Sequence, residues 1–226
     1  MDSFQALSAK KLVIFDLDGT IVDNAETFMS SYRYAIDKVC GKDYRLQNFP
    51  DSLLQTFVEK PLEPQLRDNG MDEAAIKKIR PIYDEHKFSL LHQNTPIPKM
   101  INLIKDLHEK GVQMAIVTHN SSDLADSILN YIGMREYFID ISGRDAGGKK
   151  SDRIIALMKK HGISSNADAA YIGNMQSDQA HAKTAGVDYK DVTDFPNKIR
   201  LTINSFPRVK STATQPISNH KTQGFG

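Results

Sequence analysis

Apolar runs of strand length alternate with amphipathic segments along most of the chain. The apolar runs cover residues 12–15, 112–117, 138–142 and 169–172, and a weaker edge strand is expected within 187–195. Short continuous apolar runs are typical of strands that are covered on both faces, as in parallel sheets. Because a helical segment follows each run, the pattern predicts an α/β fold: a doubly wound parallel sheet with right-handed connections.

The helices predicted between these strands carry their apolar residues at three- and four-residue spacing, which places those residues on one face. These helices span 99–110, 123–132, 152–161 and 177–185, and they are followed by Gly111, Gly133, Gly162 and Gly186. Glycine readily adopts the left-handed conformation that ends many helices. Each predicted helix therefore has a defined end.

A long region without strand signals follows the first strand. Three helices are expected there: residues 25–40, which Gly41 ends, a short helix that Asp51 caps, and a helix that begins at residue 73 and that Asp72 caps. Pro81 has no backbone N–H and is expected to bend or break the third helix. We therefore expect a core formed by residues 10–23 and 95–200, an inserted all-helical cap domain at 24–94, and a polar C-terminal tail at 201–226.

Composition narrows the classes of partner. The 226 residues include 29 Lys and Arg against 28 Asp and Glu, a formal net charge of +1, which gives no broad positive field for nucleic acid. The single cysteine, Cys40, excludes an internal disulfide framework. No apolar run approaches the roughly 18 residues of a membrane span. We expect a cytoplasmic monomer or homodimer without nucleic-acid or membrane partners.

Two carboxylates follow the first predicted strand. Asp16 and Asp18 come directly after residues 12–15, and Gly19 and Thr20 follow them. Sites in parallel α/β sheets lie beyond the carboxyl ends of the strands, so both side chains are expected to face a crevice. Two neighbouring negative charges are costly unless a cation or a proton joins them, which favours a divalent metal. Asp-x-Asp-Gly also describes an ordinary acidic turn, and the motif alone leaves both interpretations open.

Polar residues also follow the second predicted strand. Thr118, His119 and Asn120 come directly after the apolar run of residues 112–117. A hydroxyl at this position can donate to a phosphate oxygen, together with the N–H groups that begin the next helix. Thr118 and Asn120 could equally cap that helix. Asn174 and Asp178 pose the same choice between ligating a metal and capping the helix that follows the fourth strand.

The pattern of four apolar residues followed by Asp-x-Asp-Gly-Thr resembles the first motif of the haloacid dehalogenase superfamily, whose members are mostly Mg-dependent phosphatases. Thr118, the pair Lys149 and Lys150, and the segment Gly-Asn-x-x-x-Asp at 173–178 resemble the later motifs in the same order. The helical insertion resembles the C1-type cap of the phosphoglycolate phosphatase and β-phosphoglucomutase branch. The resemblance implies a Rossmann-like core and Mg-dependent hydrolysis of a small phosphorylated metabolite.

The resemblance also implies roles for individual residues. Asp16 would form an aspartyl-phosphate, and Asp18 would transfer protons to and from the leaving group and water. Thr118 and one of Lys149 and Lys150 would bind the phosphoryl oxygens, and the spacing to Gly162 slightly favours Lys149. The expected substrate-binding residues are Gly19, Thr20, Thr118, His119 and Asn120, and the expected Mg²⁺ ligands are Asp16, Asp18 through its main-chain carbonyl, Asn174 and Asp178.

The chain departs from the family pattern at two places. Asn174 stands where the family usually has an aspartate, so the site should bind a hard cation less tightly. The proline that often follows the motif lysine is also absent. These departures leave open a degenerate member that serves as a binding module. A phosphomutase is a third interpretation.

Overall fold

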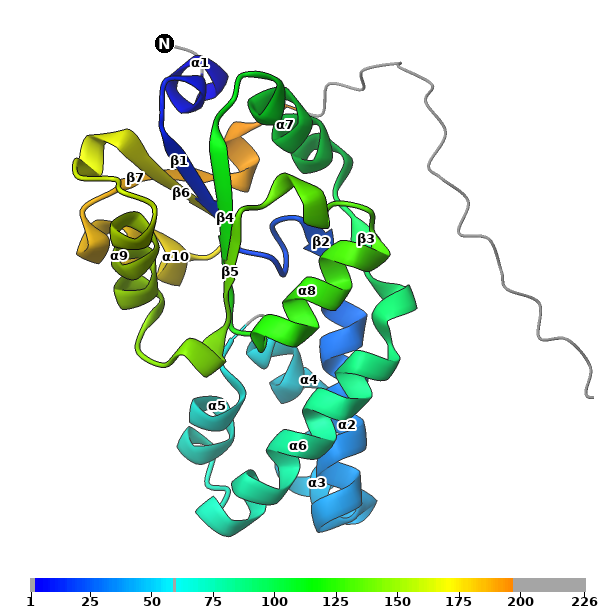
Figure 1. The fold of residues 1–226 in the computed structure, drawn as a ribbon. Helices are drawn as coiled ribbons and strands as arrows, with labels where there is room; N and C mark the ends of the chain where they lie inside the picture. Colours follow the sequence, from blue (N-terminus) through cyan, green and yellow to red (C-terminus); the bar gives the residue numbers. More distant parts are fainter. Residues whose placement is uncertain (1–2, 59, 197–226) are drawn as a thin grey trace, which may run out of the picture.

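The central sheet is parallel and has the architecture that the sequence predicts. The computed structural model describes residues 3–58 and 60–196, and within them the main sheet has the strand order β5-β4-β1-β6-β7 (Figure 1). Its strands are β1 (Leu12–Phe15), β4 (Gln113–Val117), β5 (Asp140–Ser142), β6 (Ala169–Gly173) and β7 (Asp188–Asp191). Every neighbouring pair in this sheet is parallel. Because β1 is central and the chain extends the sheet first on one side and then on the other, the predicted doubly wound α/β fold is confirmed.

Helices cover both faces of this sheet. One face carries α1 (Ser3–Ser8), α7 (Pro98–Glu109) and α8 (Ser122–Tyr131), and the other carries α9 (Lys150–Lys160) and α10 (Gln176–Ala185). Val13 and Phe15 pack on the first face, whereas Leu12 and Ile14 pack on the second. All four side chains are fully buried. This two-sided burial is the reason that β1 is a continuous apolar run rather than an alternating one.

The segment between β2 (Val22–Asp23) and β3 (Thr95–Pro96) is helical and has a hydrophobic cluster of its own. These two short strands pair antiparallel, so the chain leaves and re-enters the sheet region at one place. The segment, which we call the helical unit, contains α2 (Ala25–Cys40), α3 (Lys42–Asn48), α4 (Asp51–Leu54), α5 (Leu62–Asp68) and α6 (Glu73–Ser89). The long helices α2 and α6 pack against each other, and their cluster includes Phe28, Tyr32 and Tyr83.

Single turns of 3₁₀ helix complete the connections. They are η1 (Gln55–Phe57), η2 (Leu91–Gln93), η3 (Arg135–Tyr137), η4 (Arg144–Ala146), η5 (Asn166–Asp168) and η6 (Val192–Asp194). The expected tail, residues 201–226, and residues 197–200 of the expected core lie outside the described residues. Within the part of the chain that is described, no helix has both the length and the apolar content needed to cross a bilayer.

Of the two aspartate caps predicted in the helical segment, one is confirmed and one is corrected. Asp72 caps α6 as predicted, because its side chain accepts a hydrogen bond from the Ala75 N–H at 2.9 Å. Pro50, not Asp51, is the N-cap of α4, and Asp51 instead pairs with Arg33 and Arg45. The short helices α1, α3 and α5 were not predicted, since short segments give little periodicity to detect.

Of the two predicted effects of Pro81, a bend or a break in the third helix, the break does not occur. Helix α6 runs without interruption from Glu73 to Ser89, although a proline inside a helix normally costs about 3 kcal/mol. The buried side chains of Ile76, Ile79 and Tyr83 lie on both sides of the proline in sequence and pack into the cluster of the helical unit. This tertiary packing offsets the cost of the missing hydrogen bond.

Candidate active site

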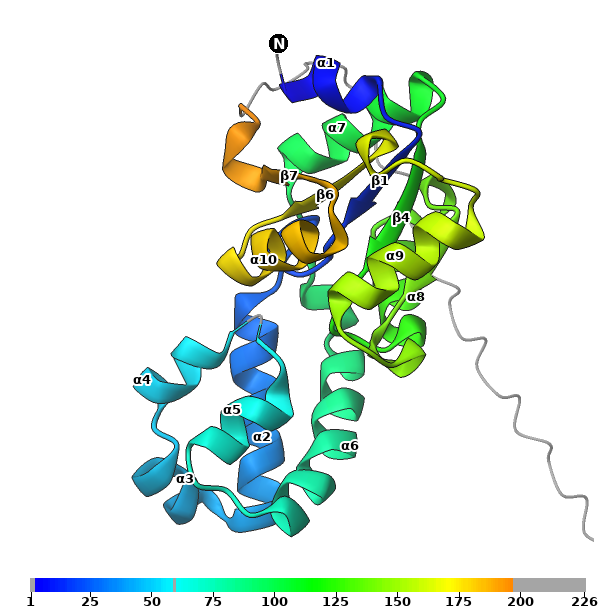
Figure 2. The same cartoon turned by 90° about the vertical axis from the view of Figure 1, so that its left-hand side faces the viewer.

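The site lies where the carboxyl ends of the central strands face the helical unit (Figure 2). Asp16 is the first residue after β1, and its backbone N–H donates to the Ile172 carbonyl of β6 at 2.8 Å. This bond continues the β1–β6 ladder and fixes the Asp16 backbone. The Asp16 side chain is 7% exposed, so a carboxylate is held almost entirely away from solvent at the end of the sheet.

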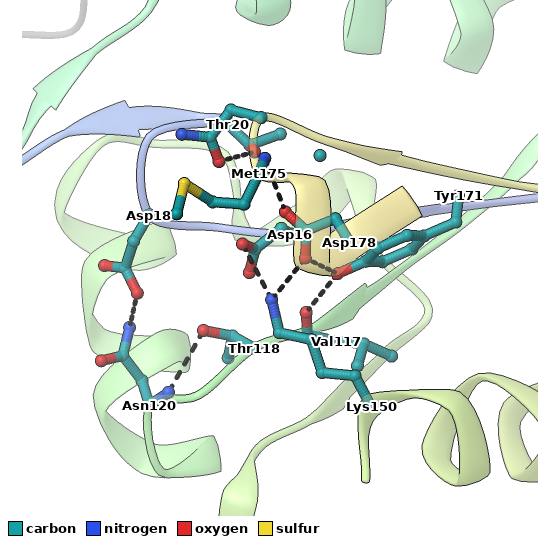
Figure 3. Close-up of polar contacts among 12 residues, drawn as sticks. Asp16, Asp18, Thr20, Val117, Thr118, Asn120, Lys150, Tyr171, Met175 and Asp178 are labelled. Carbon is teal, nitrogen blue, oxygen red and sulfur yellow. Dashed lines mark hydrogen bonds and ion pairs between the residues drawn. The ribbon is translucent and has the colours of Figure 1, made fainter. Parts of the chain in front are cut away.

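Lys150 is the cation that faces Asp16. It is the first residue of α9, and its buried ammonium lies 2.9 Å from Asp16 Oδ2 and 2.9 Å from Asp178 Oδ1 (Figure 3). Lys149 is exposed and is the N-cap of α9. The structure thus places Lys150, not Lys149, in the cluster, and the preference for Lys149 from spacing is corrected. The physical difference is that Lys150 begins α9 with its side chain buried against Asp16, whereas Lys149 precedes the helix and is exposed.

Asp178 is held by its own loop as well as by Lys150. Its carboxylate accepts from the Tyr171 hydroxyl at 3.2 Å and from the Met175 N–H at 3.2 Å (Figure 3). Gly173 is needed for this close approach, because a Cβ there would lie 2.5 Å from Asp178 Oδ2. Asp178 therefore stabilises the start of α10, as the capping interpretation predicts, and its carboxylate also holds the Lys150 ammonium.

Burial and charge set the protonation of this cluster. Burial raises the pKa of Asp16 to about 7; Lys150 opposes the rise, and the negative charges of Asp178 and Asp18 add to it. Burial alone would lower the pKa of Lys150, but its attraction to Asp16 and Asp178 outweighs burial and raises it. When Asp16 is ionised, the cluster of Asp16, Asp178 and Lys150 carries one more negative than positive charge, which favours either a proton or a further cation there.

The raised pKa of Asp16 predicts a pH dependence of stability in the metal-free protein. Between the ordinary pKa of 3.8 and about 7, the folded protein holds a proton that the unfolded chain releases. The contribution of Asp16 to the free energy of unfolding must then fall as pH rises through this window. We expect urea unfolding with a chelator present to show wild type losing stability relative to Asp16→Asn across it. A stability difference that stays constant or grows with pH would contradict this assignment.

The Asp18 carboxyl group points away from Asp16 and toward Asn120 (Figure 3). Its carboxylate accepts from Asn24 Nδ2 at 2.6 Å and from Asn120 Nδ2 at 2.9 Å, and Lys87 Nζ lies 3.4 Å away. All of these side chains are buried. The carboxyl group is thus fixed by donors from both the core and the helical unit.

Lys87 is a site residue that sequence reasoning missed. It lies on α6, is 2% exposed, donates to Asn120 Oδ1 at 2.8 Å and sits 3.6 Å from the centroid of the Phe28 ring. Burial lowers its pKa, against the attraction of Asp18. The sequence contains a signal for its burial, because Lys87 follows Tyr83 by four residues and so lies on the same helix face as Ile76 and Ile79. A lysine on the buried face of a helix is rare unless it has a partner.

The loop after β4 provides the other side of the site. The buried Thr118 hydroxyl accepts from the Asn120 N–H at 3.2 Å (Figure 3), and the Thr118 carbonyl accepts from Arg153 at 2.7 Å. Ser121 is the N-cap of α8, so Thr118 and Asn120 do not cap this helix. The half-buried His119 has a pKa lowered to about 2 by burial and by the charges of Lys150 and Arg153. Its imidazole is therefore neutral.

Thr20 and Gly19 shape the turn after Asp18. Gly19 has φ 67°, and its N–H donates to the Val22 carbonyl at 2.8 Å. The buried Thr20 hydroxyl donates to Asn174 Oδ1 at 3.3 Å. This bond joins the first and last predicted motifs and orients the amide oxygen of Asn174.

A cavity of about 110 Å³ lies between the site and the helical unit. It is lined by Asp18, Phe28, Lys60, Pro61, Leu62, Glu63, Arg80, Tyr83, Lys87, His119, Asn120 and Arg144. One wall is an ion-pair network in which Arg80 contacts Glu63 and Asp84, and Arg144 contacts Asp84. Because Arg144 belongs to the core and the others to the helical unit, this network joins the two parts beside the cavity.

The donors around Asp16 suit a hard cation. Residues 3–58 and 60–196 contain no cluster of three or more His, Cys, Asp or Glu side chains arranged to hold a metal. Oxygen ligands are nevertheless available at the ends of two paired strands, because the Asp16 carboxylate follows β1 and the Asn174 amide follows β6. Mg²⁺ prefers such oxygen ligands and commonly keeps several waters, so few protein carboxylates are required.

Comparisons with known proteins agree with this architecture. A family model described as haloacid dehalogenase-like hydrolase matches residues 13–192. A phosphoglycolate phosphatase from Vibrio parahaemolyticus is 26% identical over 78% of this chain and 80% of that protein. The tyrosine-protein kinase PtkA of Mycobacterium tuberculosis is 29% identical over 65% of this chain, which spans about half (49%) of that longer relative. A haloacid dehalogenase-like family hydrolase from Streptococcus pneumoniae has the same fold, with a TM-score of 0.69, 20% identity, and 80% and 84% of the two chains covered.

Proposed function

This chain belongs to the haloacid dehalogenase-like hydrolase family, and from that premise we propose that it hydrolyses a small phosphate monoester through an aspartyl-phosphate at Asp16. The similarity of the relatives confirms the predicted phosphoglycolate phosphatase-like branch. The observation that carries the proposal is the buried cluster of Asp16, Lys150 and Asp178 at the sheet edge, next to a cavity that Asp18 lines.

In the first step, a carboxylate oxygen of Asp16 attacks phosphorus and the bond from phosphorus to the leaving oxygen breaks. Asp18 gives a proton to that oxygen, so the leaving group departs as a neutral alcohol. Lys150 neutralises charge on the transferring phosphoryl group, and the Thr118 hydroxyl donates to one of its oxygens. The side of Asp18 that faces the cavity is the side where the leaving group has room.

In the second step, water attacks phosphorus of the aspartyl-phosphate and Asp18 takes the proton of that water. The bond from phosphorus to Asp16 breaks, which regenerates the carboxylate and releases inorganic phosphate. Dividing the reaction in this way replaces one difficult displacement by two easier ones. The buried position of Asp16 excludes most other water from the intermediate.

Mg²⁺ would be held by the Asp16 carboxylate, the Asp18 main-chain carbonyl and the Asn174 side-chain oxygen. Asp178 is engaged by Lys150, Tyr171 and the Met175 N–H, so we assign it to orientation of the site and to ligation through water at most. When bound, the cation supplies positive charge that lets two anions, the carboxylate and the phosphate ester, approach each other.

Asn174→Asp should strengthen metal binding. The substitution replaces the amide at position 174 by a carboxylate, which adds a negative charge to a proposed metal ligand. The Thr20 hydroxyl can still donate to this side chain. We expect a lower Kd for Mg²⁺, by roughly tenfold, and equal or higher activity. Calorimetric titration of the purified variant with Mg²⁺ measures the affinity without substrate. If aspartate lowers both affinity and activity, the assignment of this loop to the metal is wrong.

The hypothesis of a degenerate family member that serves as a binding module rests on Asn174 and on the absent proline. The residues that we propose for phosphoryl transfer, Asp16, Asp18 and Lys150, are nevertheless all present, which favours catalysis. Phosphate release from a panel of phosphate monoesters that includes 2-phosphoglycolate tests the proposal, with Mg²⁺ and with a chelator. We expect Mg²⁺-dependent release from at least one ester. Release that a chelator leaves unchanged would contradict it, and conversion of a sugar phosphate into its isomer without release would favour the mutase hypothesis.

A further inference from the structure

The carboxyl group of Asp18 is held mainly by the helical unit, and we propose that Lys87 and Asn24 are positioning residues that aim it at the leaving group. The inference rests on the proposed function, because it assumes that Asp18 is the proton donor. It goes further by assigning a task to two residues outside every sequence motif. Neither residue needs to contact phosphorus for this task.

The contacts to Asp18 come from two directions. Asn120 Nδ2 donates to Oδ2 at 2.9 Å from the core, whereas Asn24 Nδ2 and Lys87 Nζ approach Oδ1 at 2.6 and 3.4 Å from the helical unit. Lys87 also donates to Asn120 Oδ1 at 2.8 Å, which fixes the amide so that its NH₂ group faces Asp18. Lys87 therefore acts on both oxygens of the carboxylate, once directly and once through Asn120.

Asn24 links Asp18 to the point where the helical unit joins the core. It immediately follows β2, and Asn94 immediately precedes β3, the two strands that form this junction. Asn24 Nδ2 donates to Asn94 Oδ1 at 3.0 Å as well as to Asp18. Because Lys87 lies on α6 and Asn24 lies at the junction, the orientation of the Asp18 carboxyl group depends on contacts that the helical unit provides.

Packing does not explain a lysine at position 87. The ammonium is buried against the Phe28 ring in a region where Met would fit the same space without desolvating a charge. Lys87 and Asp18 both line the cavity of about 110 Å³ that would hold the leaving group. A charge that lies beside the proton donor and faces the same cavity is what a positioning role requires.

The dependence on leaving group separates a positioning role from a structural one. An alkyl phosphate has a poor leaving group and needs the proton from Asp18, whereas an aryl phosphate with an acidic phenol does not. We expect Lys87→Met to lower kcat/KM, which reports the transfer to Asp16 that expels the leaving group and not the later hydrolysis, by roughly 100-fold for the alkyl phosphate and by less than about threefold for the aryl phosphate. Asn24→Ala should show the same selectivity with a smaller loss. Lys78→Met, which changes an exposed lysine on the same helix, should leave both rates unchanged.

Each outcome separates the hypotheses. Equal losses of kcat/KM on both substrates in folded Lys87→Met and Asn24→Ala, checked by thermal unfolding, would overturn the positioning role. A change confined to KM would overturn it as well, since it would make Lys87 a substrate-binding residue only. If wild type and Asp16→Asn release phosphate from both esters at the same rate, the proposed function fails first and this inference fails with it.

Discussion

Asp16→Asn should release phosphate at least roughly 10³-fold more slowly than wild type, because an amide is a far weaker nucleophile than a carboxylate. Asn has nearly the same size as Asp, so the backbone bond from residue 16 to Ile172 and the packing of the sheet edge are retained. The loss should appear in kcat rather than in KM. Steady-state phosphate release with the best ester of the panel measures both.

Asp123→Asn is the matched control for this substitution. It makes the same chemical change to an exposed carboxylate in the first turn of α8 and should leave the rate unchanged. A rate for Asp16→Asn above about a tenth of the wild-type rate would mean that the residue is not the nucleophile. The cluster would then be a structural ion-pair network.

Lys150→Met has the second largest expected effect, and it acts on both activity and stability. The substitution leaves Asp16 and Asp178 buried without the ammonium that lies 2.9 Å from each. Leaving buried charges uncompensated typically costs about 3–5 kcal/mol. The loss of phosphoryl neutralisation should lower kcat/KM by roughly 10²-fold or more. Urea unfolding with a chelator and steady-state kinetics measure the two effects separately.

Lys149→Met is the control, since its side chain is exposed one residue away from Lys150. It should change the free energy of unfolding by no more than about 0.5 kcal/mol and leave the kinetics intact. The destabilisation by Lys150→Met should shrink at mildly acidic pH, because the carboxyl group of Asp16, whose pKa burial raises to about 7, then carries a proton. Equal effects of the two lysine variants would show that Lys150 has no special task.

Local sequence patterns predict the sheet and the position of Asp16 because both depend on short-range features. The continuous apolar run of β1 requires burial on both faces, and the residue after it must lie at the sheet edge. The choice between Lys149 and Lys150 depends on which residue begins α9, a boundary that the preceding loop with Gly147 and Gly148 leaves ambiguous in sequence.

Features that depend on tertiary contacts could not be predicted in the same way. Pro81 is tolerated because α6 packs against the rest of the helical unit, which the local cost of proline does not reveal. Lys87 contacts Asp18 across 69 positions of sequence, and no motif connects them. Its place on the apolar stripe of α6 indicates a buried lysine, but only the fold identifies the partner.

The central claim is that Asp16 accepts the phosphoryl group covalently, and rapid acid quench followed by peptide mass spectrometry tests it most directly. Wild-type protein is mixed with Mg²⁺ and excess substrate and quenched during turnover. We predict that the peptide containing residue 16 gains the mass of one phosphoryl group on Asp16, and that Asp16→Asn does not. Steady turnover with this peptide unmodified at every quench time, or with the phosphoryl group on a different residue, would contradict the account.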